Sequence, residues 1–90
     1  MAGPATLIEG LVLGARGRAV AGARVGWVSG PVPLPDVMLL TDAQGRFRLA
    51  APVPGTYRLS CNDDAEGSAS VELQASGKPL TLTLRLVRPR

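Results

Sequence analysis

Apolar and polar residues alternate along several short stretches of the chain, and Gly or Pro residues separate these stretches. The last stretch, residues 79–87, has leucine at every second position from 80 to 86, with threonine or arginine between. Because successive side chains of a strand point to opposite faces of a sheet, this period of two predicts β-strands with one buried face. Strands are expected over residues 6–13, 23–29, 36–40, 46–50, 56–61, 68–74 and 79–87.

No stretch has a helical period, and turn residues recur at the spacing that is typical of a β-sandwich. The chain has 90 residues, of which 46% are apolar and 19% charged, a composition that suits one small globular domain. The sequence therefore predicts an all-β fold, a seven-stranded Greek-key β-sandwich. A single domain is expected over residues 1–90, with its core over about residues 6–87.

Two of the expected strands, residues 6–13 and 36–40, are apolar on both faces. An outward apolar row on a small domain is usually covered by a second layer or by another chain. We expect these strands, together with the Pro-rich loop 30–35, to contact another protein chain or a second copy. Coverage by sheet twist and by the loop itself is the open alternative. The residues expected at such an interface are Leu7, Leu11, Leu13, Trp27, Val37 and Leu39.

The chain carries a formal net charge of +3, and nine of its ten basic residues are arginine. Arg46, Arg48 and Arg58 are expected on the outward face of two strands that can pair, which makes a basic face. Phosphate binding uses such clusters, but the interleaved aromatic side chains of a nucleic-acid-binding surface are missing. We favour a solvated face paired with acidic neighbours, and we expect no nucleic-acid partner.

The chain has no histidine, which removes Ser-His and Cys-His nucleophiles and the commonest zinc sites. The single Cys61 cannot form an internal disulfide and is expected to be a buried apolar residue. The acidic run over residues 62–67 lacks the spacing of a known calcium loop, so a solvated turn is favoured over a Ca²⁺ site. We expect no enzymatic activity, no cofactor and no metal.

The first residues lack a basic region, and Glu9 interrupts the apolar run that follows them. We therefore expect neither a signal peptide nor insertion into a membrane. The single cysteine favours a reducing compartment, and the expected location is the cytoplasm. An extracytoplasmic location stays open for a trimmed chain or one exported by a non-standard route.

Residues 41–49, TDAQGRFRL, and 54–60, PGTYRLS, each combine a Gly-containing turn with strict alternation. Asp42 can accept backbone N–H bonds at the start of its turn, and Gly45 can adopt a positive φ at its end. Together with GLV at 10–12, VAGARV at 20–25 and LTLTLRL at 80–86, this pattern resembles the carboxypeptidase regulatory-like domain, a transthyretin-like (prealbumin-like) β-sandwich.

The resemblance covers about residues 8–86 and implies an accessory module without catalytic groups. Hydrolases and dioxygenases with similar sandwiches need histidines, which this chain lacks. The expected function is protein–protein interaction or assembly, including a role as the small subunit of a larger complex. The alternative is a module that binds a small ligand or a carbohydrate, which needs a concave site displaying Trp27 or Tyr57. The sequence leaves open whether Trp27 is core or exposed.

Overall fold

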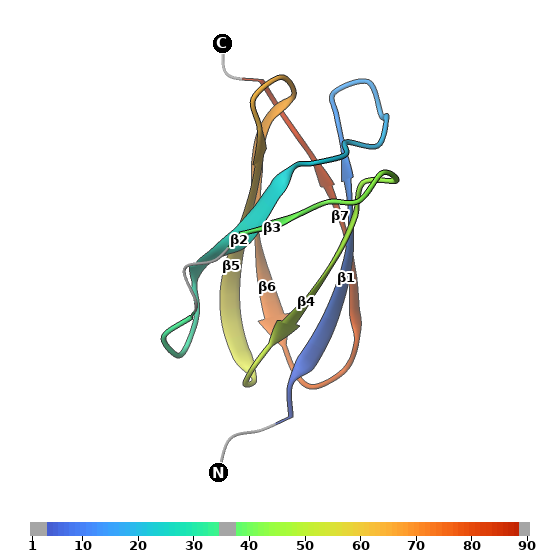
Figure 1. Ribbon diagram of the computed structural model, residues 1–90. Coiled ribbons are helices and arrows are strands. Elements are labelled where there is room, and N and C mark those ends of the chain that lie inside the picture. Colours follow the sequence, from blue (N-terminus) through green and yellow to red (C-terminus); the bar gives the residue numbers. More distant parts are fainter. Residues whose placement is uncertain (1–3, 35–37, 89–90) are drawn as a thin grey trace.

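The computed structural model describes residues 4–34 and 38–88, so Val37, one of the expected interface residues, lies outside the described residues. The prediction of an all-β fold is confirmed, and the described ranges contain no helix. The strands are β1 (Thr6–Leu13), β2 (Arg24–Ser29), β3 (Leu39–Leu40), β4 (Arg46–Ala51), β5 (Gly55–Asp63), β6 (Gly67–Ala75) and β7 (Leu80–Arg85) (Figure 1).

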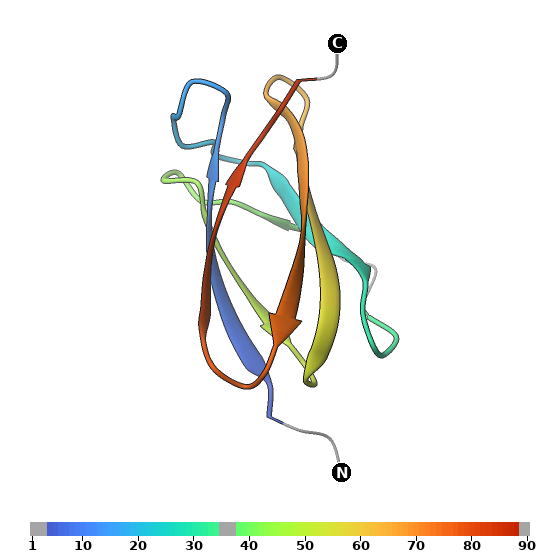
Figure 2. The ribbon, with the colours of Figure 1, turned by 180° about the vertical axis from the view of Figure 1, so that it is seen from behind.

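The strands form two sheets that pack as two layers, as in a β-sandwich (Figures 1 and 2). One sheet has the order β4-β1-β7, in which β1 pairs antiparallel with β4 and parallel with β7. The other has the order β3-β2-β5-β6 and is antiparallel throughout. The alternating residues that face inward fill the space between the sheets. The fully buried members of this core include Ile8, Val12, Val25, Tyr57, Leu59, Cys61 and Leu86.

A close contact between Phe47 and Gly10 sets the pairing of β1 and β4. The two residues lie opposite each other in the ladder, and both are buried. A Cβ atom at Gly10 would lie 2.0 Å from the Cζ atom of Phe47, so the phenyl ring occupies the space that a side chain would take. A glycine in the interior of a strand destabilises the strand, and here the aromatic ring packs over the glycine backbone.

We expect Gly10→Ala to lower the free energy of unfolding by about 1–3 kcal/mol, because the added methyl group forces the Phe47 ring out of its site. Urea denaturation measures this change. Gly26→Ala is the matched control, because the closest atoms that a Cβ there would meet belong to the flexible side chain of Met38, at 3.2 Å, and the Met38 Cα is at an ordinary contact distance of 3.8 Å. Equal losses in the two variants would contradict the role assigned to Gly10.

The turn over residues 41–45 adopts the geometry that its sequence predicts. The Asp42 carboxylate oxygen Oδ1 accepts the N–H groups of Gln44 and Arg46, each at 2.9 Å. The Gly45 N–H donates to the Asp42 carbonyl oxygen at 2.9 Å, and Gly45 has a φ of 76°. A Cβ at Gly45 would also lie 2.7 Å from the Val12 carbonyl oxygen, so both φ and space require glycine.

Thr41 ties this turn to the connection between β1 and β2, a link that the sequence analysis missed. Its buried hydroxyl donates to the Val20 carbonyl oxygen at 2.6 Å and accepts the Ala23 N–H at 2.9 Å. Its backbone exchanges two further bonds with Gly22 and Ala23, each of 3.0 Å. A single residue therefore satisfies several backbone groups that would otherwise be buried without partners.

We expect Thr41→Val to destabilise the fold by about 1–3 kcal/mol, because the isosteric side chain leaves the Val20 carbonyl and the Ala23 N–H unpaired. Thr41→Ser keeps the hydroxyl and should lose markedly less. Thermal or urea unfolding of both variants makes the comparison. If the valine variant were as stable as the serine variant, the hydroxyl would not be the stabilising group.

Candidate functional site

The outward face of the three-stranded sheet has leucines along its central strand. Side chains on β1 alternate, so Ile8 and Val12 are buried and the three leucines point out, with Leu7 45% exposed. The register places Arg46 and Thr83 on either side of Leu11. We call this surface the leucine face; its residues are Leu7, Glu9, Leu11, Leu13, Arg46, Arg48, Ala50, Thr81, Thr83 and Arg85.

The leucine face is positively charged. It has three arginines and one glutamate, which gives a formal charge of +2 from those four side chains. The only ion pair within it joins the Arg48 guanidinium to Glu9 at 3.4 Å, and the two side chains are 75% and 54% exposed. Among the residues that the structure describes, Arg46 and Arg85 have no carboxylate within ion-pair distance. The face therefore combines an apolar centre with a basic rim.

Leu39, another expected interface residue, lies on the inner face of the four-stranded sheet. Leu39 lies opposite Val25 in the β2–β3 ladder, which places it on the core side of the sheet, where it is partly buried. The exposed apolar side chains of this segment are instead Met38 and Leu40, at 43% and 64%. The expected placement of Leu39 at an interface therefore stays a prediction: its side chain is on the core side of the sheet but only partly buried, at the β3 edge.

The three arginines of the expected basic face do not share one surface. Arg46 and Arg48 lie on β4, and Arg58 lies on β5, which belongs to the other sheet. Outward residues of the two sheets point in opposite directions. Arg58 pairs with Glu72 across the β5–β6 ladder, with 3.7 Å between the charged groups. Alternation showed that these side chains point outward, but it could not show which strands pair.

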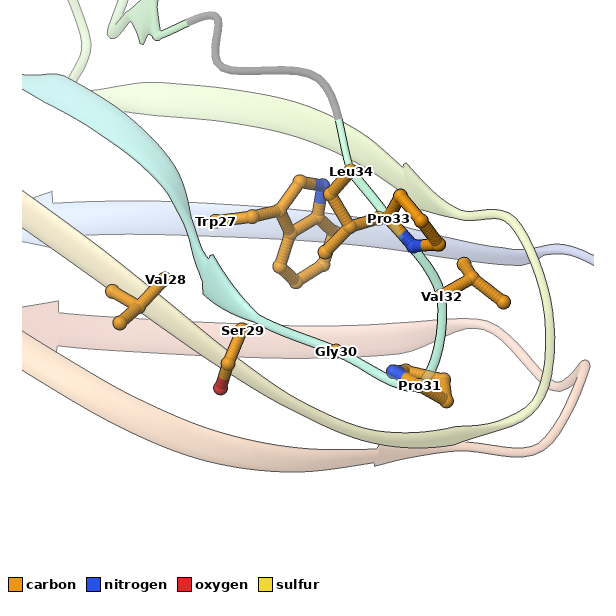
Figure 3. A pocket seen from close by; sticks show the side chains of 8 residues that line it. All are labelled: Trp27, Val28, Ser29, Gly30, Pro31, Val32, Pro33 and Leu34. Atoms are coloured by element: carbon orange, nitrogen blue, oxygen red, sulfur yellow. The ribbon is translucent and has the colours of Figure 1, made fainter.

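Trp27 and Tyr57 pack against each other, with ring centroids 4.9 Å apart and an angle of 44° between the ring planes. Tyr57 is fully buried, and its hydroxyl donates to the Val53 carbonyl oxygen at 2.6 Å. The half-buried Trp27 lines a hollow together with the described part of the Pro-rich loop, residues 30–34 (Figure 3). Tyr57 therefore offers no surface to a ligand, and Trp27 offers only part of its ring.

A second hollow, the β3–β4 groove, opens where the edges of the two sheets approach each other. Its volume is about 600 Å³, and it is open to solvent. The Phe47 ring and Leu39 supply apolar lining, and Arg46 and Arg48 supply positive charge. The full lining is Glu9, Gly10, Leu39, Leu40, Asp42, Arg46, Phe47 and Arg48.

The acidic residues near the end of β5 form hydrogen bonds and ion pairs within the chain. Asp63 Oδ2 accepts the N–H groups of Ala65 and Glu66, each at 3.1 Å, which shapes the turn. Asp64 pairs with Arg24 at 2.7 Å, and Glu66 pairs with Arg88 at 3.5 Å. Over residues 4–34 and 38–88, no three His, Cys, Asp or Glu side chains gather at one place. The same ranges hold no helix able to reach across a lipid bilayer.

Cys61 is buried in the core, as the sequence predicts. Burial raises the pKa of its thiol from 9.0 to about 11, and the nearby Asp63 carboxylate adds to the rise. Because only the thiolate is a good nucleophile, burial and the raised pKa make this cysteine a poor nucleophile at neutral pH.

We expect the Cys61 thiol to resist a disulfide reagent at pH 8 in the native state and to react once the protein is unfolded in urea. Below pH 9 the thiol is protonated in both the folded and the unfolded state. As the pH rises from 9 to 11, the thiol of the unfolded state loses its proton first, so the free energy of unfolding falls. In the Cys61→Ala variant, the free energy of unfolding should therefore fall less between pH 9 and pH 11 than it does in the wild type. Rapid labelling of the native protein would contradict the assignment.

Comparison of the chain with protein-family models found no match, and comparison with curated proteins found none either.

Proposed function

We propose that this chain is a non-enzymatic accessory module of the carboxypeptidase regulatory-like, transthyretin-like type, with a Greek-key β-sandwich, and that it binds another protein. The observation that carries the proposal is the leucine face. Its three leucines lie on the central strand of an open sheet face, and Leu7 is nearly half exposed. An apolar row with a polar rim is the usual arrangement of a protein-binding surface.

The charge of the leucine face identifies the kind of partner. Arg46, Arg48 and Arg85 surround the leucines, and Glu9 is the only acidic residue among them. Two copies packed face to face would bring like charges together, which opposes self-association. We therefore assign the face to a different protein, one with an apolar centre and acidic residues at its rim.

The small-ligand and carbohydrate alternative has less support. Carbohydrate sites stack sugar rings on exposed aromatic faces, and Tyr57 is fully buried with its hydroxyl bonded to the Val53 backbone. Trp27 packs against Tyr57 and exposes only part of its ring. The leucine face, in contrast, carries three arginines and one glutamate around its leucines, which gives it a definite charge.

A photoreactive amino acid at position 11 tests the proposal in cells, with the same group at Ser70 as the control. Ser70 is exposed on the outward face of the other sheet. We expect position 11 to form an adduct with an acidic protein and position 70 to form none. The captured protein is then purified and titrated against this chain.

We expect Leu11→Ser to weaken that purified complex by about tenfold or more, because a partly exposed leucine becomes buried on binding. Thr56→Ser, outside the face, should leave the affinity unchanged. An adduct between two copies of this chain would overturn the assignment to a different protein. Monomeric sedimentation combined with no adduct at position 11 would refute the proposed function.

A further inference from the structure

Strand β4 is an open edge of the three-stranded sheet. Among the described residues it pairs with β1 alone, through a ladder from Thr6–Ala51 to Leu11–Arg46 that has no register shift. The opposite side of the molecule is bridged, because Ser68 and Val87 exchange two backbone hydrogen bonds of 3.0 and 2.9 Å. Sheet edges in proteins are usually blocked by proline, by a bulge or by a covering segment. β4 contains neither a proline nor a bulge.

The hydrogen-bonding phase of β4 shows which of its backbone groups point outward. The Val12 N–H donates to the Gly45 carbonyl oxygen at 2.8 Å, and in an antiparallel ladder bonded pairs occur at every second residue. Phe47, Leu49 and Ala51 therefore bond to β1, whereas the N–H and C=O groups of the residues between them point away. At Arg46, the N–H donates to the Asp42 carboxylate and the carbonyl oxygen accepts the Asp42 N–H.

Arg48 and Ala50 are left with outward-pointing N–H and C=O groups. Within the described residues, these two donors and two acceptors make no hydrogen bond to another part of the chain. Arg48 and Ala50 are separated by one residue, Leu49. An antiparallel strand added at this edge would form its hydrogen bonds with every second residue of β4, and these two residues have that spacing.

The surroundings of β4 indicate what an added strand would contain. A side chain opposite Phe47 would enter the β3–β4 groove, where the Phe47 ring and Leu39 are apolar. A side chain opposite Leu49 would lie on the same inner face of the sheet. Side chains opposite Arg46 and Arg48 would lie on the outer face beside two guanidinium groups. Residues of the added strand therefore alternate between apolar and acidic.

We propose that β4 binds an extended segment of the partner protein as a fourth strand, with acidic residues alternating with apolar ones. This inference rests on the proposed function, that the domain binds another protein. The eight residues of β1 at ~3.3 Å each, across three strands ~4.8 Å apart, give the leucine face a flat area of roughly 300–400 Å². A stable interface buries about 800 Å² on each partner, so contact with the neighbouring β4 edge supplies surface that the face lacks.

A second copy of this chain does not fit the same edge. Antiparallel pairing of β4 with its own copy about Leu49 puts Arg48 opposite Ala50 and brings the two Arg48 side chains together diagonally. It also puts Arg46 opposite Pro52, which has no N–H to donate. Pairing about Arg48 puts the two arginines directly opposite each other. The charge that attracts an acidic strand therefore opposes self-pairing.

The test uses a synthetic peptide, acetyl-Glu-Val-Glu-Val-Glu-Val-amide, with the Lys-Val peptide of equal length as the control. Amide hydrogen exchange followed by NMR reports the backbone groups that become bonded. We expect saturating Glu-Val peptide to slow exchange at Arg48 and Ala50 by at least about tenfold. Phe47 and Leu49, already bonded to β1, should change little, and the Lys-Val peptide should have no effect. Protection that appears only outside β4 would overturn the proposal.

Ala50→Pro removes one outward N–H without removing a bond to β1, and Ala50→Ser is the matched control that keeps the N–H. We expect the proline variant to lose at least tenfold in peptide affinity and the serine variant to bind as the wild type does. The double variant Arg46→Glu, Arg48→Glu provides a second test that introduces no proline. We expect it to bind the Lys-Val peptide more tightly than the Glu-Val peptide, the reverse of the wild-type preference. Unchanged preference in the double variant would refute the charge complementarity.

The same variants separate this inference from the proposed function. If the protein captured through position 11 binds Ala50→Pro and Ala50→Ser equally well, the domain binds proteins but strand addition is wrong. If the Glu-Val peptide protects β4 and Ala50→Pro abolishes that protection, strand addition stands whatever position 11 captures.

Discussion

The packing of the Phe47 ring over Gly10 fixes the register of β1 and β4, and both sides of the three-stranded sheet depend on that register. A slip of one residue would turn every side chain of a strand to the other face. Ile8 and Val12 would leave the core, and the leucines that now point outward would enter it. The glycine contributes by having no side chain, because any Cβ would displace the ring that holds the two strands in place. The basic rim beside the leucines follows from the same pairing, since Arg46 lies opposite Leu11.

The turn over residues 41–45 decides where the free part of the β4 edge begins. Asp42 binds both outward backbone groups of Arg46, so this end of the strand is closed. Thr41, next to it, is anchored to Val20 and Ala23 in the connection between β1 and β2. The turn is thus anchored to the connection between β1 and β2. The outward backbone groups without a partner among the described residues are those of Arg48 and Ala50. A short, defined edge of this kind limits unspecific strand pairing.

The sequence predicted the strands and their inward residues well because these depend on local rules. Alternation identified the inward positions of β5, and Asp42 with Gly45 identified the turn. Sheet membership depends on long-range pairing, which alternation does not encode, so the expectation of one basic face for Arg46, Arg48 and Arg58 does not hold in the structure. The direction of the Leu39 side chain could not be predicted for a similar reason, since both faces of its segment are apolar and only the β2–β3 register distinguishes them. The role of Thr41 involves residues 21 and 18 positions away, and the only signal for it was a threonine beside a turn aspartate.

Arg48 belongs to both proposed contact surfaces, and its ion pair explains how it can serve both. On the leucine face it pairs with Glu9 at 3.4 Å, with both side chains mostly exposed. Exposed pairs of this kind contribute less than about 1 kcal/mol, so exchanging Glu9 for a carboxylate of a partner is nearly neutral in free energy. A partner that buries the leucines would also exclude water from the arginine, and the new pair would then act at a lower dielectric than the old one. The two proposed contacts, at the face and at the edge, are therefore linked through a single guanidinium group. Salt should weaken the two contacts together, because both depend on the same positive charge.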